Sequence, residues 1–209
     1  MDDKLTDALA NLEENAVLAL VKERLESNQD PLAILRACQE GMLQVGKRYE
    51  ACEYFVSDLM LAGEIFKQVA DVLSPKLKGV AARPRGKVVI GTVKGDIHDI
   101  GKNLVVTLLR AANYEVYDLG VDVPPRRFVE VLKETGAPVV GLSALLTVAF
   151  DGMKETLAAL DGAGLRRQVK VMIGGGTITQ ETVAYIGADA MGRDAQAAVT
   201  LCNQWIKAS

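Results

Sequence analysis

The sequence predicts two domains of different class: a bundle of helices over residues 1–80, then a doubly wound sheet of parallel strands over residues 88–209. Three observations support this prediction. Before residue 80, glycine and β-branched residues are scarce, and apolar residues recur at helical spacing. After Lys87, short β-rich runs alternate five times with helical patterns. Between these regions lies a stretch with the composition of a linker. The 209 residues are enough for a sizeable buried core.

The first part of the chain contains three helical patterns, with room for a short helix before them. Residues 15–25 form the first pattern, and Asp30 followed by Pro31 is typical of the start of the next helix. Apolar residues three and four apart mark the faces of two further helices: Leu35, Cys38, Met42, Val45 and Tyr49, then Phe55, Leu59, Ala62, Phe66, Val69 and Leu73. Four such helices would form a small antiparallel bundle.

The predicted linker is Ser74–Lys87, with two prolines, two glycines, five cations and no acidic residue. The alternative is a solvated loop inside one domain.

The second part alternates between strand and helix patterns. Strands are predicted at 88–92, 116–119, 139–142 and 169–173, with a weak fifth at 188–191. The helices between and after them are predicted at 101–112, 125–135, 150–163, 179–186 and 194–207. With the strand order 2-1-3-4-5, the first and third strands are neighbours, and ligands bind where their carboxyl ends meet.

Composition excludes several classes of protein. The formal net charge of −3 lacks the basic excess of a protein that binds nucleic acid or an anionic membrane surface. The three cysteines have no CxxC spacing, which fits a reducing compartment. The acidic start has no apolar signal core, and the longest uncharged stretch, Thr135–Phe150, is too short to span a bilayer. We therefore expect a cytoplasmic protein with neither nucleic-acid nor membrane partners.

The single histidine, His98, lies in a polar loop between the first strand of the sheet and the following helix. The segment is Gly95, Asp96, Ile97, His98, Asp99, Ile100 and Gly101. One interpretation is structural: Asp99 caps the helix, Asp96 is a turn residue and His98 is an exposed polar side chain. The other is a metal-ligating imidazole oriented by a carboxylate. Because one imidazole cannot hold a free ion, a metal here would need a macrocycle, either haem or a corrinoid.

Two further loops at the same edge of the sheet contain candidate residues. Ser143, Leu145 and Thr147 follow the third strand, and Ser143 could reach Asp96 to complete a His98–Asp96–Ser143 relay; the alternative is an ordinary buried serine bonded to backbone. Gly174, Gly175 and Gly176 follow the fourth strand and would permit close approach to a bulky ligand or phosphate, although tight turns use glycine too. The cysteines lie in helical patterns and are interpreted as small core residues.

Together these residues resemble the cobalamin-binding signature, which consists of the motifs Asp-x-His-x-x-Gly, Ser-x-Leu and Gly-Gly. The first of these motifs lies within the longer stretch GTVKGDIHDIGKNLV. Upstream, GMLQVGKRYEACEYFVSDLMLAGEIF is similar to the helical cap of corrinoid proteins in methyltransferase systems and of cobalamin-dependent methionine synthase. The resemblance covers nearly the whole chain, and implies a helical cap followed by a flavodoxin-like cobalamin-binding domain. It departs at Cys52, where the family often has glycine, and at Met191, where an aromatic residue is common.

The resemblance also implies roles for individual residues. His98 would be the lower axial cobalt ligand, Asp96 would accept from its other nitrogen, and Ser143 would bond to Asp96. Gly101 would let the helix start near the displaced nucleotide tail. Other contacts implied for the cofactor come from the sheet domain, at Gly95, Ile97, Asp99, Ile100, Leu145, Thr147 and Gly174–Gly176, and from the cap, at Phe55, Leu59 and Met60.

The implied function is that of a corrinoid methyl carrier, without complete catalysis of its own. It would pass a methyl group from a substrate-specific methyltransferase to a second methyltransferase acting on tetrahydrofolate or a thiol, and would need a reductive activator. Two alternatives remain: a cobalamin-binding sensor or regulator, and a small subunit of an adenosylcobalamin-dependent mutase.

Overall fold

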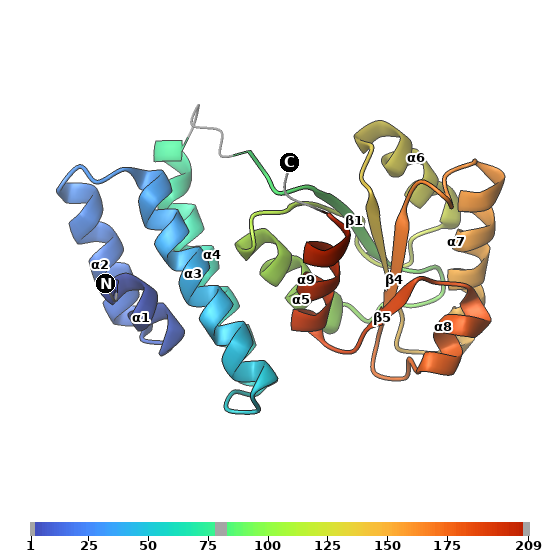
Figure 1. The fold of residues 1–209 in the computed structure, drawn as a ribbon, viewed down its shortest axis with the longest axis horizontal. Helices are drawn as coiled ribbons and strands as arrows, with labels where there is room; N and C mark the ends of the chain where they lie inside the picture. Colours follow the sequence, from blue (N-terminus) through green and yellow to red (C-terminus); the bar gives the residue numbers. More distant parts are fainter. Residues whose placement is uncertain (1–2, 78–82, 207–209) are drawn as a thin grey trace. The chain divides into compact units, whose positions relative to one another are not determined.

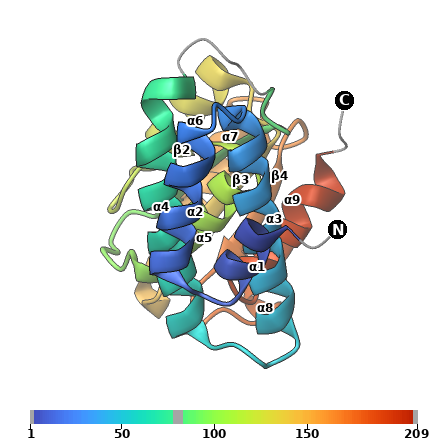
Figure 2. The ribbon, with the colours of Figure 1, turned by 90° about the vertical axis from the view of Figure 1, so that its left-hand side faces the viewer.

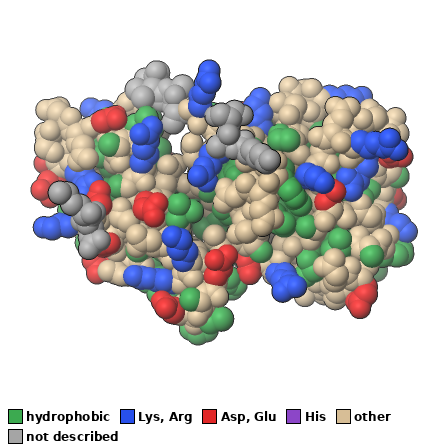
Figure 3. All heavy atoms as spheres, viewed as in Figure 1, with side chains coloured by type: hydrophobic (Ala, Val, Ile, Leu, Met, Phe, Trp, Pro, Cys, Tyr) green, Lys and Arg blue, Asp and Glu red, His purple; other side chains and the backbone are tan. Residues whose placement is uncertain are grey.

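The computed structural model describes residues 3–77 and 83–206. The chain divides into two compact units, Met1–Arg83 and Pro84–Ser209 (Figure 1). Within the described ranges, no helix is long and apolar enough to cross a membrane. Figure 3 shows cationic and anionic side chains interspersed over the face in view, as the small net charge of −3 would suggest.

The first unit consists of helices that pack side by side (Figure 2). They are α1 (Lys4–Ala10), α2 (Glu14–Glu26), α3 (Pro31–Glu50) and α4 (Val56–Leu77). As predicted, Asp30 caps α3: its carboxylate accepts from the backbone N–H of Leu32 at 3.0 Å, with Pro31 in the first turn. Helices α1 and α3 approach closely at Gly41, where a Cβ would lie 2.9 Å from the carbonyl oxygen of Thr6.

The two predicted apolar faces are buried with three exceptions. Ile34 takes the core position in the first turn of α3, and Leu35 and Tyr49 are only half-buried. Phe55 precedes α4 and is 70% exposed. Its backbone N–H donates to the carboxylate of Asp58 in the first turn of the helix. Helix α4 also passes through Pro75 and ends at Leu77, so the predicted linker begins too early. Residues 78–82 of that linker lie outside the described residues.

The cysteines divide between core and turn. Cys38 and Cys202 are fully buried, and burial raises the pKa of each thiol to about 12. Cys52, by contrast, lies exposed in the turn between α3 and α4, so its predicted place in a helix core is wrong. Its φ of +60° belongs to the left-handed region that favours glycine. This geometry explains why glycine would suit position 52.

The second unit is an α/β domain built on a parallel sheet. Its strands are β1 (Lys87–Thr92), β2 (Glu115–Asp118), β3 (Val139–Ser143), β4 (Lys170–Gly174) and β5 (Ala190–Gly192). The helices are α5 (Ile100–Ala111), α6 (Pro125–Thr135), the short 3₁₀ turn η1 (Thr147–Ala149), α7 (Phe150–Gly162), α8 (Gln180–Ile186) and α9 (Ala195–Trp205). All the predicted strands and helices of this unit are present, and their ends differ from the predicted ends by no more than two residues.

The sheet has the predicted strand order β2-β1-β3-β4-β5, with every pair parallel. Helices α5 and α9 pack together on one face, and α6, α7 and α8 cover the other (Figure 1). This is a flavodoxin-like arrangement. Thr92 pairs with Ser143 and Ser143 with Gly174, so strands β1, β3 and β4 end at one level. The loops that follow them therefore meet at one edge.

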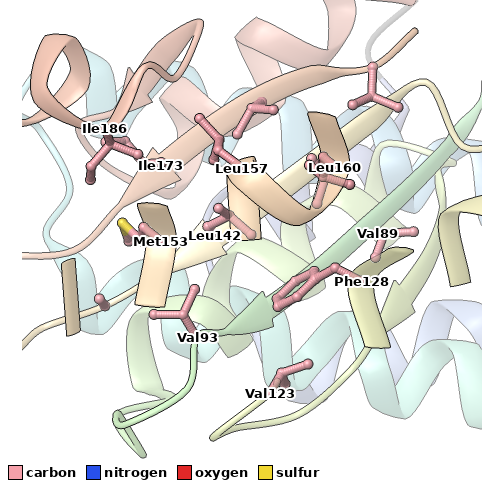
Figure 4. Close-up of a cluster of buried hydrophobic side chains, with 14 of the residues drawn as sticks. Val89, Val93, Val123, Phe128, Leu142, Met153, Leu157, Leu160, Ile173 and Ile186 are labelled. Atoms are coloured by element: carbon pink, nitrogen blue, oxygen red, sulfur yellow. The ribbon is translucent and has the colours of Figure 1, made fainter. Parts of the chain in front are cut away.

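A hydrophobic core fills the space between the sheet and helices α6, α7 and α8 (Figure 4). Phe128 from α6 is fully buried in this core, as is Val89 of β1. Position 91 in β1 has little room for a side chain, since a Cβ there would lie 3.0 Å from the ring of Phe128. The strands β1, β3 and β4, whose loops meet at the carboxyl edge, all contribute side chains to this core.

Candidate functional site

His98 lies in the loop between β1 and α5, at the carboxyl edge of the sheet. Its side chain is 49% exposed, and its Nδ1 lies 2.7 Å from Oδ1 of the buried Asp96. Because an ionised carboxylate can only accept, Nδ1 is a protonated nitrogen of the ring. Nε2 makes no hydrogen bond to any residue that the structure describes. In the Nδ1–H tautomer, Nε2 has the lone pair that a metal bound at this nitrogen requires.

Asp96 is ionised because of the backbone around it. Burial alone would raise the pKa of its carboxyl, but hydrogen bonds from the backbone N–H groups of Leu146, His98 and Leu145 and from the His98 ring outweigh burial. The pKa falls to about 2. Oδ1 accepts from the N–H and Nδ1 of His98, while Oδ2 accepts from the N–H of Leu145 at 2.7 Å and of Leu146 at 2.9 Å.

The hydrogen bond predicted between Ser143 and Asp96 is not formed in this structure. Ser143 lies at the end of β3, but the described residues include no hydrogen bond between its hydroxyl and Asp96. The two backbone N–H groups of Leu145 and Leu146 occupy Oδ2 instead. Sequence reasoning missed these donors because a backbone N–H is present at every residue except proline and leaves no signal in the sequence.

Glycines at the end of β4 and just after it lie beside the loop that follows β3. Gly175 has a φ of +147°, and a Cβ there would lie 1.7 Å from the carbonyl oxygen of Ala144. Nearby, Thr177 donates from its hydroxyl to the carbonyl of Leu145 at 2.8 Å. Gly174 and Gly176 are less crowded, with nearest atoms 3.4 and 3.3 Å from a Cβ. At Gly175, then, glycine is required by the neighbouring loop itself.

Exposed apolar side chains lie on the loop of His98 and on the loop after β3 that binds Asp96. Ile97 and Ile100 are 72% and 71% exposed, and Leu145 and Leu146 are also exposed on the loop after β3. Val148, in the turn that begins at Thr147, is exposed too. Apolar side chains concentrated around one imidazole need a large apolar partner to cover them.

The remaining predicted site residues are less distinctive. Gly95, with a φ of +86°, and Gly101 both face open space, where a Cβ would meet nothing within 4 Å. Asp99 is the cap residue of α5, yet its side chain makes no capping bond. In the helical unit, Met60 is 52% exposed, whereas Leu59 is fully buried and so is no candidate contact.

Other residues near the site escaped the sequence analysis. Lys102, in the first turn of α5, is 3% exposed and pairs with Asp118 at the end of β2. Its signal was available: Lys102, Val106 and Leu109 share the helical spacing of the buried face. A lysine on the apolar face of a helix marks a buried cation that needs a partner.

These features define a class of protein. A flavodoxin-like sheet carries an imidazole whose Nδ1 faces a carboxylate, whose Nε2 bonds to none of the described residues, and whose loop bears exposed apolar side chains. One imidazole cannot hold a metal alone, so the site fits a metal in an apolar macrocycle.

Comparison with known proteins identifies the macrocycle. Family models described as "B12 binding domain" match residues 86–201 and residues 1–74. The chain belongs to the family of corrinoid proteins with B12-binding domains, so its cofactor is cobalamin or a related corrinoid.

The similarity extends over whole chains. Dimethylamine corrinoid protein 2 of Methanosarcina mazei is 39% identical over 96% of this chain and 94% of its own length. A crystal structure of a cobalamin-binding protein from Desulfitobacterium hafniense is 38% identical, with a TM-score of 0.77 over 97% of each chain. The methanol:cobalamin methyltransferase complex MtaBC of Methanosarcina barkeri contains a chain 26% identical, with a TM-score of 0.85 over 99% of this chain and 79% of that one.

Proposed function

We propose that this protein is a methyl carrier that binds its corrinoid with Nε2 of His98 as the lower axial ligand of cobalt. The observation that carries the proposal is the geometry of His98 and Asp96, with Nδ1 and Oδ1 2.7 Å apart and Nε2 free. When bound, the corrinoid supplies a cobalt ion that alternately accepts and gives up a methyl group.

The protein's own residues bind and orient the ring. Asp96 holds the proton on Nδ1 and so keeps Nε2 available. Ile97, Ile100 and Leu145 offer apolar surface to the lower face of the macrocycle, and Gly101 leaves open space at the start of α5 for the displaced nucleotide tail. We further propose that Met60 and Phe55, both exposed in the helical unit, belong to the cap over the upper face.

The proposed partners are two methyltransferases, one specific for the methyl donor and a second that acts on tetrahydrofolate or a thiol, together with a reductive activator. Relatives named for dimethylamine and for a methanol:cobalamin methyltransferase complex support the first of these. Because those names point to different donors, the proposal for this chain stays at the class of methylated small molecule.

Reconstitution tests the cofactor site. The apo protein is titrated with hydroxocobalamin beside His98→Ala, followed by visible absorption. We expect one corrinoid per wild-type chain, with the spectrum of an imidazole-coordinated cobalt. The variant should bind more weakly and lack that spectrum. An identical spectrum in the variant would contradict the role of His98.

The carrier role is tested with the loaded, reduced protein and one methyltransferase at a time, each supplied with its own donor. We expect one donor class to methylate the cobalt, seen as loss of the reduced-cobalt absorption, and the donor without enzyme to leave it unchanged. Methylation at the same rate without any enzyme would contradict a carrier that depends on its partners.

A further inference from the structure

Lys102 is a buried cation to which the proposed function gives no role. Its Nζ lies 2.8 Å from both carboxylate oxygens of Asp118 and 2.6 Å from Oδ1 of Asn103. These contacts use all three protons of the ammonium group. Desolvation of a buried ion pair costs about as much as the attraction returns, so stability alone is a poor reason for its presence. A positional role explains it better.

A chain of hydrogen bonds leads from this ion pair to the residue beside His98. Nδ2 of Asn103 donates to Oδ2 of Asp99 at 3.0 Å, and its backbone N–H donates to the carbonyl of Asp99 at 2.7 Å. Asp99 directly follows His98 and is the cap residue of α5. Lys102 thus fixes Asn103, and Asn103 fixes Asp99.

The segment after β2 holds the loop on the other side of His98 as well. Asp122 accepts from the N–H of Gly95 at 2.8 Å, and its own N–H donates to the carbonyl of Asp96 at 2.9 Å. With Lys102 bound to the end of β2, the His98 loop is anchored before and after the imidazole. Both anchors come from one short stretch, 118–122.

We propose that Lys102, together with Asp118 and Asn103, is a positioning residue for His98. The ion pair fixes the first turn of α5 on the end of β2 and so sets the direction of Nε2, while Asp96 sets the tautomer of the ring. The inference rests on the proposed function, in which Nε2 is the cobalt ligand. Loss of a residue that orients a metal ligand typically costs about 10–100-fold in metal affinity.

The test is a double-mutant cycle between Lys102→Met and His98→Ala. Methionine keeps an unbranched apolar stem and removes the charge. The affinity for hydroxocobalamin is measured by titration, and nitrogen splitting by electron paramagnetic resonance of the divalent cobalt form. We expect Lys102→Met to weaken binding on the order of 10-fold and to diminish the splitting. In the His98→Ala background it should change affinity by less than about twofold, since no ligand remains to be misplaced.

Matched variants separate positioning from folding. Lys170, at the start of β4, is also paired with a carboxylate: its Nζ lies 3.3 Å from Oδ1 of Asp189. Lys170→Met should leave the affinity for hydroxocobalamin and the nitrogen splitting unchanged. If Lys102→Met does not fold, Asp118→Asn replaces it in the same cycle, because asparagine keeps the volume and one acceptor oxygen.

The outcomes distinguish the two proposals. Two outcomes would overturn the positioning role alone. One is that Lys102→Met lowers the affinity equally with His98 present and in the His98→Ala background. The other is that Lys102→Met shows the same nitrogen splitting as the wild-type protein. Absence of histidine nitrogen splitting in the wild-type protein would overturn the assignment of His98 as ligand, and the positioning role with it.

Discussion

The carboxylate of Asp96 joins His98 to the loop after β3: Oδ1 lies 2.7 Å from Nδ1 of His98, and Oδ2 accepts from the backbone N–H of Leu145 at the same distance. One buried side chain therefore orients the imidazole and fixes the neighbouring apolar residues. The carboxylate of Asp96 therefore fixes the position of Nε2 of His98 relative to Leu145 and Leu146.

Asp96→Asn should weaken both the orientation of the His98 ring and the attachment of the loop after β3. The amide group places a donor where either the ring or the two backbone N–H groups need an acceptor, so one side of the network loses its partner. We expect a loss of about 1–3 kcal/mol in the unfolding free energy of the apo protein, measured by urea denaturation. Asp161→Asn, at an exposed position of α7, is the control and should change little. Equal stability of the two variants would contradict this network.

Ser143→Ala should leave the site nearly intact, because the Ser143 hydroxyl does not bond to Asp96. We expect a change in unfolding free energy within about 0.5 kcal/mol and an unchanged spectrum of the corrinoid-loaded protein. A spectral change as large as that of His98→Ala would contradict this expectation and place the Ser143 hydroxyl in the relay.

Gly175→Ala should be strongly destabilising. The new Cβ would lie 1.7 Å from the carbonyl oxygen of Ala144, and the φ of +147° disfavours alanine. We expect a loss of more than about 2 kcal/mol in unfolding free energy. Gly162→Ala is the matched control, since a Cβ there meets nothing within 4 Å and α7 gains a better helix former. Because Gly162 is the last residue of α7, that variant should be neutral or gain up to about 0.5 kcal/mol through the unfolded state. Similar stability of the two variants would contradict the close contact between loops.

Asp189 should make stability depend on pH. Burial alone would raise the pKa of its carboxyl, but the N–H of Val171 and the charges of Arg166 and Lys170 outweigh burial and lower it from 3.8. A lowered pKa stabilises the folded protein above 3.8, and this contribution disappears as the pH falls through the folded-state pKa. The difference in unfolding free energy between wild type and Asp189→Asn should therefore be largest near neutral pH and shrink in acid. A constant difference across that range would contradict the assignment.

The fold was largely predictable because its signals are periodic. Apolar residues such as Val69 and Leu73 in α4 repeat at helical spacing, and β1 and β3 are short runs of buried residues between helices. Errors arose where local hydrogen bonds override the pattern. Phe55 fits the spacing of α4 but lies outside the helix, because Asp58 binds its N–H.

The site was predictable only in its side chains. His98, Asp96 and the glycine-rich turn were recognisable from residue type and order. The donors to Oδ2 of Asp96 were not, because they are backbone groups that face it only after β1 and β3 pair. Lys102 was recognisable in principle by its place on an apolar helix face, but its partner Asp118 depends on the packing of α5 against β2.

The most direct test of the central claim uses the fact that the chain contains one histidine, His98. The protein is produced with histidine containing the heavy isotope of nitrogen, loaded with unlabelled cobalamin, and reduced to the divalent cobalt form. Electron paramagnetic resonance then reports the nucleus of the axial nitrogen. Coordination by His98 predicts that the nitrogen triplet of the unlabelled protein becomes a doublet on labelling. A triplet that persists would show that the cofactor's own base binds cobalt, and would contradict the assignment of His98 as the axial ligand.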